Sequence, residues 1–331
     1  MTGEKVLITG ASGQIALPMA RKLARDNEVW GVARFRAPQP SVTRGPARIA
    51  DLRSELESAG VTTLALDLAG GDLSSLPDDF STVIHMAVSI EPTPDYDHAL
   101  RMNAEVTGEL MAHCRSARAF LHMSSCSVYR PAADPAYPFR ETDPLGEAGT
   151  PFAPTYSVSK IGGEAVARFC ARQFGLPTTI ARMNVSYGAN GGMPAYMVES
   201  MLAGRPVRLR PPGPNYYTPI HEDDIIDQVG KLLDVAAVPA EIVNWGGDDI
   251  VSAEEWIAYL AELTGLEARI DYRDDWITSG PTDNSKRIGL IGPCRVGWRE
   301  GMRRMVEERH PELQLRDGPA DATRSARTAG N

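Results

Sequence analysis

The sequence lacks several features that would assign it to a common class of protein. Its four cysteines, Cys114, Cys126, Cys170 and Cys294, show no CxxC spacing and no neighbouring histidine pair. Neither a zinc site nor a disulfide framework is therefore predicted, and the thiols are expected to be free. No apolar run approaches the roughly 18 residues of a membrane span, and no signal-peptide pattern precedes the first strand-like run. We predict a soluble, cytoplasmic protein that binds no membrane and no metal.

Positive charge is also scarce. The chain of 331 residues carries a net charge of −9 at pH 7 and has no basic run. Nucleic acids and anionic membranes attract basic surfaces, so neither is a predicted partner. With 43% apolar and 23% charged residues, the chain can form a full core and a smaller appended region.

The chain does contain a regular alternation of short apolar runs and amphipathic stretches. The runs suit buried strands and the stretches have the apolar period of helices. This order predicts an α/β fold with a doubly wound parallel sheet of the Rossmann type, which binds ligands at the carboxyl ends of its strands. The runs begin at residues 6, 28, 62, 82, 119 and 177, and the helical stretches lie at 14–25, 96–117 and 156–174.

A glycine-rich turn follows the first strand-like run. In TGASGQIALPMARKLA, Gly10 and Gly13 are followed by Ala16, where a third glycine often stands. A tight glycine turn lets backbone N–H groups approach a pyrophosphate at a helix N-terminus. The strand before it and the helix after it supply the required context, so we predict dinucleotide binding, although these residues also permit a plain strand-to-helix turn.

The residue after the second run indicates which dinucleotide binds. An NAD site has an Asp or Glu near this point for the ribose 2′-hydroxyl, but this sequence has Arg34, with Arg36 close by. A cation suits a 2′-phosphate, so NADP(H) is favoured and NAD(H) stays possible; alternatively, Arg34 only caps a strand.

Asp67 ends the third run and is placed to form a hydrogen bond with the adenine amino group, although an Asp there is equally common as a helix cap.

Two regions are expected from the alternation of strand-like runs and helical stretches along the chain. Residues 1–183 with 216–246 would form the NADP-binding Rossmann domain, and 184–215 with 247–315 a substrate-binding region. Residues 316–331 lack apolar content and are expected to be a disordered tail. Further helices are predicted at 222–236, 252–264 and 298–309.

Tyr156 and Lys160 stand four residues apart at the start of a helical stretch. Positions four apart lie on one helix face, so the phenol and the ammonium point the same way. In isolation, such a pair is usually a half-buried tyrosine beside a snorkelling lysine. The surrounding segments change that interpretation.

With these segments the chain resembles the extended short-chain dehydrogenase/reductase family, in its NAD(P)-dependent epimerase/dehydratase-like branch. The resemblance covers nearly the whole globular chain, and it depends on the order and spacing of the segments. They are TGASGQIA, LDL at 66, HMA at 85, NAEVT at 103, SSCSVY at 124, ETDP at 141, YSVSK at 156, ARMNVSYG at 181, PIHEDDI at 219 and DNSKRIGLIG at 283.

The resemblance implies roles for particular residues. Tyr156 would be the catalytic acid/base, Lys160 its partner, Ser125 the holder of the substrate oxygen, and Asn103 part of a water-mediated proton relay behind Lys160. The predicted cofactor contacts are Gly10, Ser12, Gly13, Gln14, Ile15, Arg34, Asp67, Leu68, Met86, Ala87, Tyr156 and Lys160, and the predicted substrate contacts are Ser89, Cys126, Asn184, Tyr187 and Tyr217. Tyr187 and Tyr217 are included as aromatic lining of the pocket, and the alternative is that they are ordinary core residues.

The chemistry of hydride transfer agrees with those roles. Hydride addition to a carbonyl leaves an alkoxide, which needs a proton from a group poised near neutral pH. A free phenol has a pKa of about 10, so the Lys160 ammonium is expected to favour the phenolate and lower that pKa. Lys160 would also bind the nicotinamide ribose, and Ser125 would donate to the oxygen where charge develops.

Departures from the family pattern narrow the reaction. Sugar-nucleotide dehydratases carry an acidic pair where this chain has Cys126 and Ser127, so a 4,6-dehydratase is not expected. Sugar-nucleotide epimerases commonly place an arginine where this chain has Tyr217. Their asparagine three residues after Arg182 is also displaced, because Asn184 stands two residues on.

These departures and Arg34 favour an NADPH-dependent carbonyl reductase acting on a small or aromatic substrate. An NAD(P)-dependent nucleotide-sugar epimerase is the alternative, and a non-catalytic NADP-sensing regulator is the second alternative. The helical stretches at 96–117 and 155–174 match those that form the dimer interface in many family members, so a homodimer is expected by analogy. His85 is assigned to a strand end on the cofactor side and His221 to packing at a helix start.

Overall fold

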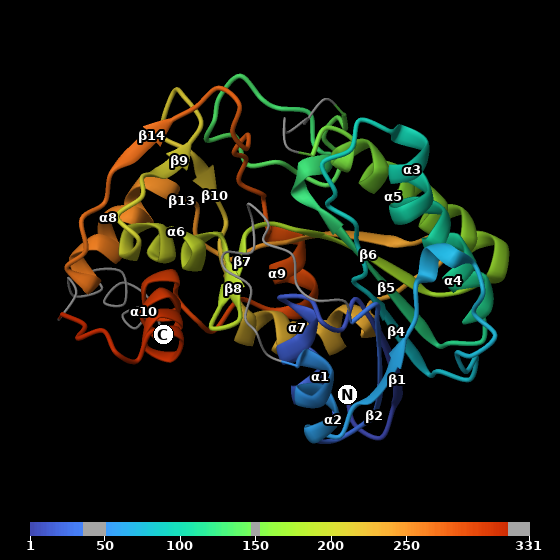
Figure 1. Ribbon diagram of the computed structural model, residues 1–331. Coiled ribbons are helices and arrows are strands. Elements are labelled where there is room, and N and C mark those ends of the chain that lie inside the picture. Colours follow the sequence, from blue (N-terminus) through green and yellow to red (C-terminus); the bar gives the residue numbers. More distant parts are fainter. Residues whose placement is uncertain (36–50, 147–152, 317–331) are drawn as a thin grey trace, which may run out of the picture.

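A parallel sheet forms the centre of the molecule. The computed structural model describes residues 1–35, 51–146 and 153–316. Within these ranges the sheet has seven parallel strands in the order β12-β6-β5-β4-β1-β2-β3 (Figure 1). Each predicted run contributes a strand, which confirms the doubly wound α/β fold. The strands are β1 (Lys5–Thr9), β2 (Glu28–Ala33), β3 (Thr62–Ala65), β4 (Thr82–His85), β5 (Ala119–Ser125), β6 (Thr178–Met183) and β12 (Glu241–Trp245).

Helices cover both faces of the sheet. Side chains alternate along a strand, so Val6 and Ile8 of β1 lie in one core cluster and Leu7 lies in another. The first cluster is completed by helices α1 (Ala16–Leu23), α2 (Leu52–Ser58) and α7 (Glu222–Asp234), and the second by α4 (Val106–His113) and α5 (Tyr156–Phe174).

The predicted helix at 96–117 is not continuous. After α3 (Tyr96–Leu100) the chain makes a π-helical turn over Arg101–Glu105 before α4 begins. Asn103 lies in this turn and is buried. Such turns inside helices often occur at functional sites.

A smaller region packs around its own core, which includes Trp256. The helices predicted at 222–236, 252–264 and 298–309 are confirmed as α7, α8 (Ala253–Thr264) and α10 (Trp298–Arg309). All the cysteines lie in the described residues as free thiols, as predicted. The tail predicted at 316–331 lies, except for residue 316, outside the described residues, and the residue ranges of the two domains stay a prediction. The remaining elements are β7 (Ser186–Gly188), β8 (Gly191–Gly192), α6 (Met193–Leu202), β9 (Val207–Leu209), β10 (Tyr216–Tyr217), β11 (Ile220–His221), β13 (Val251–Ser252), β14 (Ile270–Tyr272) and α9 (Ser285–Ile291).

Candidate active site

The predicted glycine turn joins β1 to α1. Gly10 has a φ of +69°, and a Cβ there would lie 2.9 Å from the backbone of Ala87. A Cβ on Gly13 would lie 2.9 Å from the Gly10 carbonyl oxygen, to which the Gly13 N–H donates at 2.7 Å. Glycine is therefore required at both positions. The close turn brings backbone N–H groups to the N-terminus of α1, so these residues fit the pyrophosphate of a dinucleotide.

The loop after β4 packs against this turn. The N–H groups of Met86 and Ala87 each donate to Thr9 Oγ1 at 3.1 Å, and the same oxygen lies 2.7 Å from His85 Nδ1. His85 is thus at the strand end beside the turn, as predicted. Burial, and then the Lys160 charge, lower its pKa to about 3. Met86 and Ala87 border the predicted cofactor site.

Arg34 and Asp67 follow β2 and β3 at the same edge of the sheet. Arg34 is exposed, and its companion Arg36 lies outside the described residues. Asp67 Oδ1 accepts the Ala69 N–H at 3.3 Å and caps a short helical turn that includes the buried Leu68. The cap that the sequence left open for Asp67 is therefore present, and its contact with adenine stays a prediction.

Gln14 connects the glycine turn with the smaller region. Its Nε2 donates to Ser186 Oγ at 3.3 Å, and Asn190 Nδ2 donates to its backbone oxygen at 2.7 Å. Ser12 and Ile15 beside it are half-buried. Sequence reasoning identified Gln14 but missed Ser186 and Asn190, because no motif links residues so far apart in the chain.

Ser125 and Tyr156 meet where β5 ends and α5 begins. Burial raises the pKa of the Tyr156 phenol to about 12, and a hydrogen bond with Ser125 acts in the opposite direction. Ser125 Oγ also accepts the Ser127 N–H at 3.2 Å. The predicted pairing of a serine and a tyrosine at one point is therefore present.

Lys160 is buried one turn after Tyr156, with 3% of its surface exposed. Its Nζ donates to the Met123 carbonyl oxygen at 2.5 Å. Burial lowers its pKa to about 8, and the charge of Glu164 opposes that change. At Tyr156 burial outweighs the other causes, and the Lys160 ammonium is bonded to a carbonyl, so the expectation that Lys160 lowers the pKa of Tyr156 stays a prediction.

Asn103 holds two segments together through its side chain. Its Oδ1 accepts the Ser89 N–H at 2.7 Å, and its Nδ2 donates to the Ser89 carbonyl and to Ser159 Oγ, each at 2.9 Å. These bonds engage both N–H groups of the amide. Asn103 therefore positions the loop after β4 against α5, and its part in a water-mediated proton relay stays a prediction.

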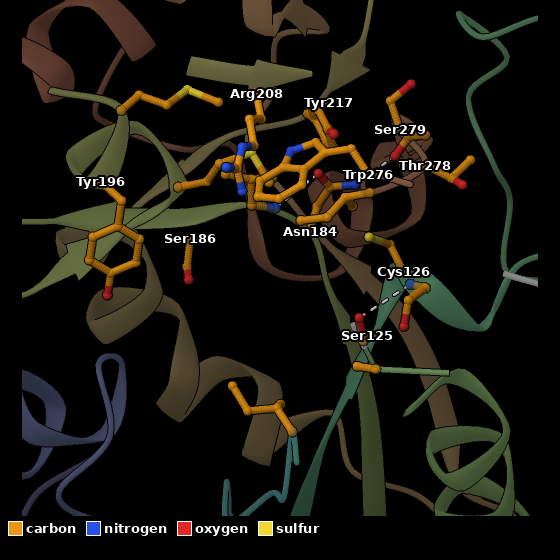
Figure 2. Close-up of a pocket in the computed structure, with 18 of the residues that line it drawn as sticks. Ser125, Cys126, Asn184, Ser186, Tyr196, Arg208, Tyr217, Trp276, Thr278 and Ser279 are labelled. Carbon is orange, nitrogen blue, oxygen red and sulfur yellow. Dashed lines mark hydrogen bonds between the residues drawn. The ribbon is translucent and has the colours of Figure 1, made fainter. Parts of the chain in front are cut away.

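A cavity of about 1270 Å³ extends from Ser125 and Tyr156 into the smaller region. Figure 2 shows Arg208 and Trp276 together on the side of the cavity away from Ser125, and the Arg208 guanidinium carbon lies 5.7 Å from the centroid of the Trp276 ring. The aromatic residues that line the cavity are Tyr129, Phe139, Tyr156, Tyr196, Tyr217 and Trp276, and the charged ones are Glu199, Arg205 and Arg208.

The predicted substrate contacts divide into two groups. Cys126, Asn184 and Tyr217 line the cavity, whereas Ser89 and Tyr187 are not among the described residues that do. Tyr187 is 1% exposed and donates to the Trp298 carbonyl at 3.3 Å in the core of the smaller region, so its assignment was wrong. Ser89 is held at Asn103 by its backbone, next to the lining residue Ile90.

The geometry agrees with the result of a family comparison. The model of the NAD dependent epimerase/dehydratase family matches residues 6–246. The chain belongs to this family. The predicted resemblance is thereby confirmed, and the protein is an enzyme of an NAD-dependent family with a nucleotide-binding Rossmann fold.

Individual members of the family are more distant. The chain is 23% identical over 281 residues to the uncharacterized UDP-glucose epimerase YtcB of Bacillus subtilis, covering 82% of this chain and 85% of that protein. It is 26% identical over 292 residues to a dTDP-4-dehydro-6-deoxy-D-allose reductase of a Streptomyces species, covering 81% and 83%.

A solved structure of the family has the same fold. The UDP-glucuronic acid 4-epimerase of Bacillus cereus, in complex with UDP-glucuronic acid and NAD, matches with a TM-score of 0.77 at 21% identity, covering 93% of this chain and 99% of that one.

In the described residues, no helix has the length and apolar character needed to cross a membrane.

Proposed function

We propose that this enzyme is an NAD(P)-dependent epimerase that inverts one carbinol carbon of a nucleotide sugar. The observation that carries the proposal is the cavity of about 1270 Å³ beside Tyr156. Pockets of roughly 300–1,000 Å³ hold drug-sized ligands, so this one suits a nucleotide sugar better than a small carbonyl compound. The names of relatives support the same substrate class. The small-substrate reductase favoured from the sequence therefore becomes the second candidate.

Positive charge in the cavity supports a diphosphate. Arg208 lies in the middle of β9 and Arg205 two residues before this strand; both line the cavity and are exposed. Arginine pairs well with phosphate oxygens because its planar guanidinium offers several donors. Sugar-nucleotide epimerases commonly have an arginine where this chain has Tyr217, whereas the arginines that line this cavity lie in and just before β9. We therefore propose that Arg208 contacts the diphosphate beside Trp276.

The residues at the other end of the cavity would handle protons. When bound, the dinucleotide would supply a nicotinamide able to accept a hydride from the sugar carbon and to give it back to the opposite face. Tyr156 would accept the hydroxyl proton when the carbonyl forms and return it when the carbonyl is reduced. Ser125 would donate to the same oxygen. Hydride and proton are both restored, so the reaction consumes no oxidant.

The choice of cofactor is a separate part of the proposal. The family is NAD-dependent, and the glycine turn fits either dinucleotide. Arg34 is a cation where an NAD site has an acid, so we propose that the enzyme accepts NADP(H).

A direct assay tests the reaction. Purified enzyme is incubated with UDP-glucose, UDP-glucuronic acid and the corresponding dTDP-sugars, and proton NMR follows the anomeric signals. We expect a second epimer to appear without net change in dinucleotide absorbance. The Tyr156→Phe variant should bind dinucleotide normally and form no epimer.

The reductase is tested in the same experiment. Its specific support is Arg34, since NADPH commonly drives net reductions, together with the similarity to a sugar-nucleotide reductase. Added NADPH and a 4-keto nucleotide sugar would then be consumed one for one. Stoichiometric consumption without any epimer would replace the epimerase with the reductase.

A further inference from the structure

Glu164 continues the catalytic face of α5. Tyr156, Lys160 and Glu164 follow one another at intervals of four residues, so their side chains lie along one side of the helix. Glu164 is 3% exposed, like Lys160. Burial of the Glu164 carboxylate costs free energy, because desolvation of a charge is unfavourable. The carboxylate therefore needs hydrogen-bonding partners, and its position calls for a functional reason.

The partners of Glu164 come from the two strands next to α5. Its Oε1 accepts the hydroxyl of Ser124 at 2.6 Å, and Arg182 donates Nε to Oε1 at 2.9 Å and Nη2 to Oε2 at 2.7 Å. Ser124 precedes Ser125 on β5, and neighbouring side chains on a strand point to opposite faces. The carboxylate therefore fixes the end of β5 against α5 from the side opposite the cavity.

The groups that face Lys160 leave its charge dependent on Glu164. His85 on β4 and His122 on β5 are both buried, and burial followed by the Lys160 charge keeps their pKa values far below the ordinary range. Both imidazoles are therefore neutral. Tyr156 on α5 is also uncharged below its raised pKa of about 12. Among the described residues, Glu164 is the carboxylate whose charge raises the pKa of Lys160.

We propose that Glu164 is a positioning residue that keeps Lys160 protonated at working pH and holds the Ser125 end of β5 in register with Tyr156. This inference rests on the proposed function and adds to it that Lys160, which the resemblance implies to be the partner of Tyr156, takes part in turnover while it is protonated. Loss of the Glu164 charge would leave the Lys160 and Arg182 cations without their buried anion. Lys160 would then release its proton at a lower pH.

The first test is the pH profile of Glu164→Gln. The amide keeps the shape of the side chain and removes its charge, so the fall in kcat at alkaline pH should begin roughly 1 pH unit lower than in the wild type. Ser124→Ala is the matched control, because it removes a hydrogen bond to the same carboxylate without removing charge. Its alkaline limb should not move. If both variants shift equally, the charge of Glu164 is not what matters.

The second test needs no substrate and separates this inference from the epimerase proposal. Lys160 has a folded pKa of about 8, below its ordinary value of 10.5, so the unfolded chain binds more protons between these pH values. The free energy of unfolding that Lys160 contributes therefore rises with pH in that window. In Glu164→Gln the rise should start at a lower pH, as measured by urea unfolding across the window.

The Lys160→Met background provides the decisive comparison. There, Glu164→Gln should no longer move the pH dependence of unfolding. A shift that persists without Lys160 would overturn the proposal, even if the enzyme proves to be an epimerase. Should Glu164→Gln fail to fold because the Arg182 charge is left unpaired, Glu164→Gln with Arg182→Met is compared with Arg182→Met alone, since those two proteins differ only in the Glu164 charge.

Discussion

The absence of a Cβ atom at Gly10 determines the shape of the predicted cofactor site. An alanine there would have a strained φ of +69° and a Cβ 2.9 Å from the backbone of Ala87. We expect Gly10→Ala to lower the free energy of unfolding by about 1 to 3 kcal/mol. It should also abolish dinucleotide binding, as measured by fluorescence titration of NADPH and NADH.

Gly60→Ala is the control for backbone strain alone. Gly60 has a φ of +88°, but no atom lies within 4 Å of the position that a Cβ would take there. It should lose stability and keep dinucleotide affinity. Equal affinity losses in both variants would show that the close approach of Ala87 is not what shapes the site.

The proposed preference for NADP(H) depends on Arg34, another single residue. Arg34→Ala should weaken NADPH binding by about tenfold or more and leave NADH binding nearly unchanged, since only NADPH carries the 2′-phosphate. Arg53→Ala is a suitable control, because Arg53 is a nearby cation already paired with Glu57 at 2.9 Å. The two dissociation constants, measured by calorimetry, check the prediction. A similar loss for both dinucleotides would contradict it.

Residues with a local motif could be predicted, and residues that meet only through the fold could not. Gly10, Ser125 and Tyr156 stand in short segments whose chemistry depends on local spacing. Ser186 and Arg208 reach the site from the smaller region, which no spacing reveals. Tyr187 was assigned to the pocket because it is aromatic, but large aromatic side chains fill cores as readily as they line cavities.

At the scale of the element, helix α8 contains a complete capping box. Glu255 N–H donates to Ser252 Oγ at 3.1 Å, and Ser252 N–H donates to Glu255 Oε2 at 3.0 Å. Ser252→Ala should therefore lower the free energy of unfolding by about 1 kcal/mol, measured by urea unfolding. Ser252→Thr keeps the hydroxyl and should lose much less. An alanine variant as stable as the wild type would show that the cap contributes nothing.

The elements themselves could be predicted where the apolar period was unbroken. β1 to β6 came from clear apolar runs. β12 was not identified as a strand because Asn244 interrupts its run; the structure buries that amide by bonding it to Tyr129, Phe139 and Asp283. The π-helical turn at Arg101–Glu105 was missed because one extra residue in a turn hardly alters a helical pattern.

At the scale of the whole molecule, α5 presents apolar side chains to solvent. Phe169 is 63% exposed and Val158, three turns earlier on the same helix, is 40% exposed. We propose that this face forms the homodimer expected from the sequence. Phe169→Glu should shift the protein to monomers in light scattering after size exclusion. Ile250→Glu, at another exposed apolar position, is the control and should leave the mass unchanged. A wild-type monomer would refute the dimer.

The Gln14 bridge has a consequence for binding equilibria. Gln14 belongs to the dinucleotide turn and also lines the substrate cavity, where it meets Ser186. A ligand in either site therefore lies next to Gln14. If one ligand changes the affinity for the other, the affinities for dinucleotide and substrate must change by the same factor. We expect UDP to tighten NADPH binding in calorimetry, and Asn190→Ala, which frees the Gln14 backbone oxygen, to reduce that factor toward one. An enzyme built this way retains its coenzyme most firmly while it is occupied.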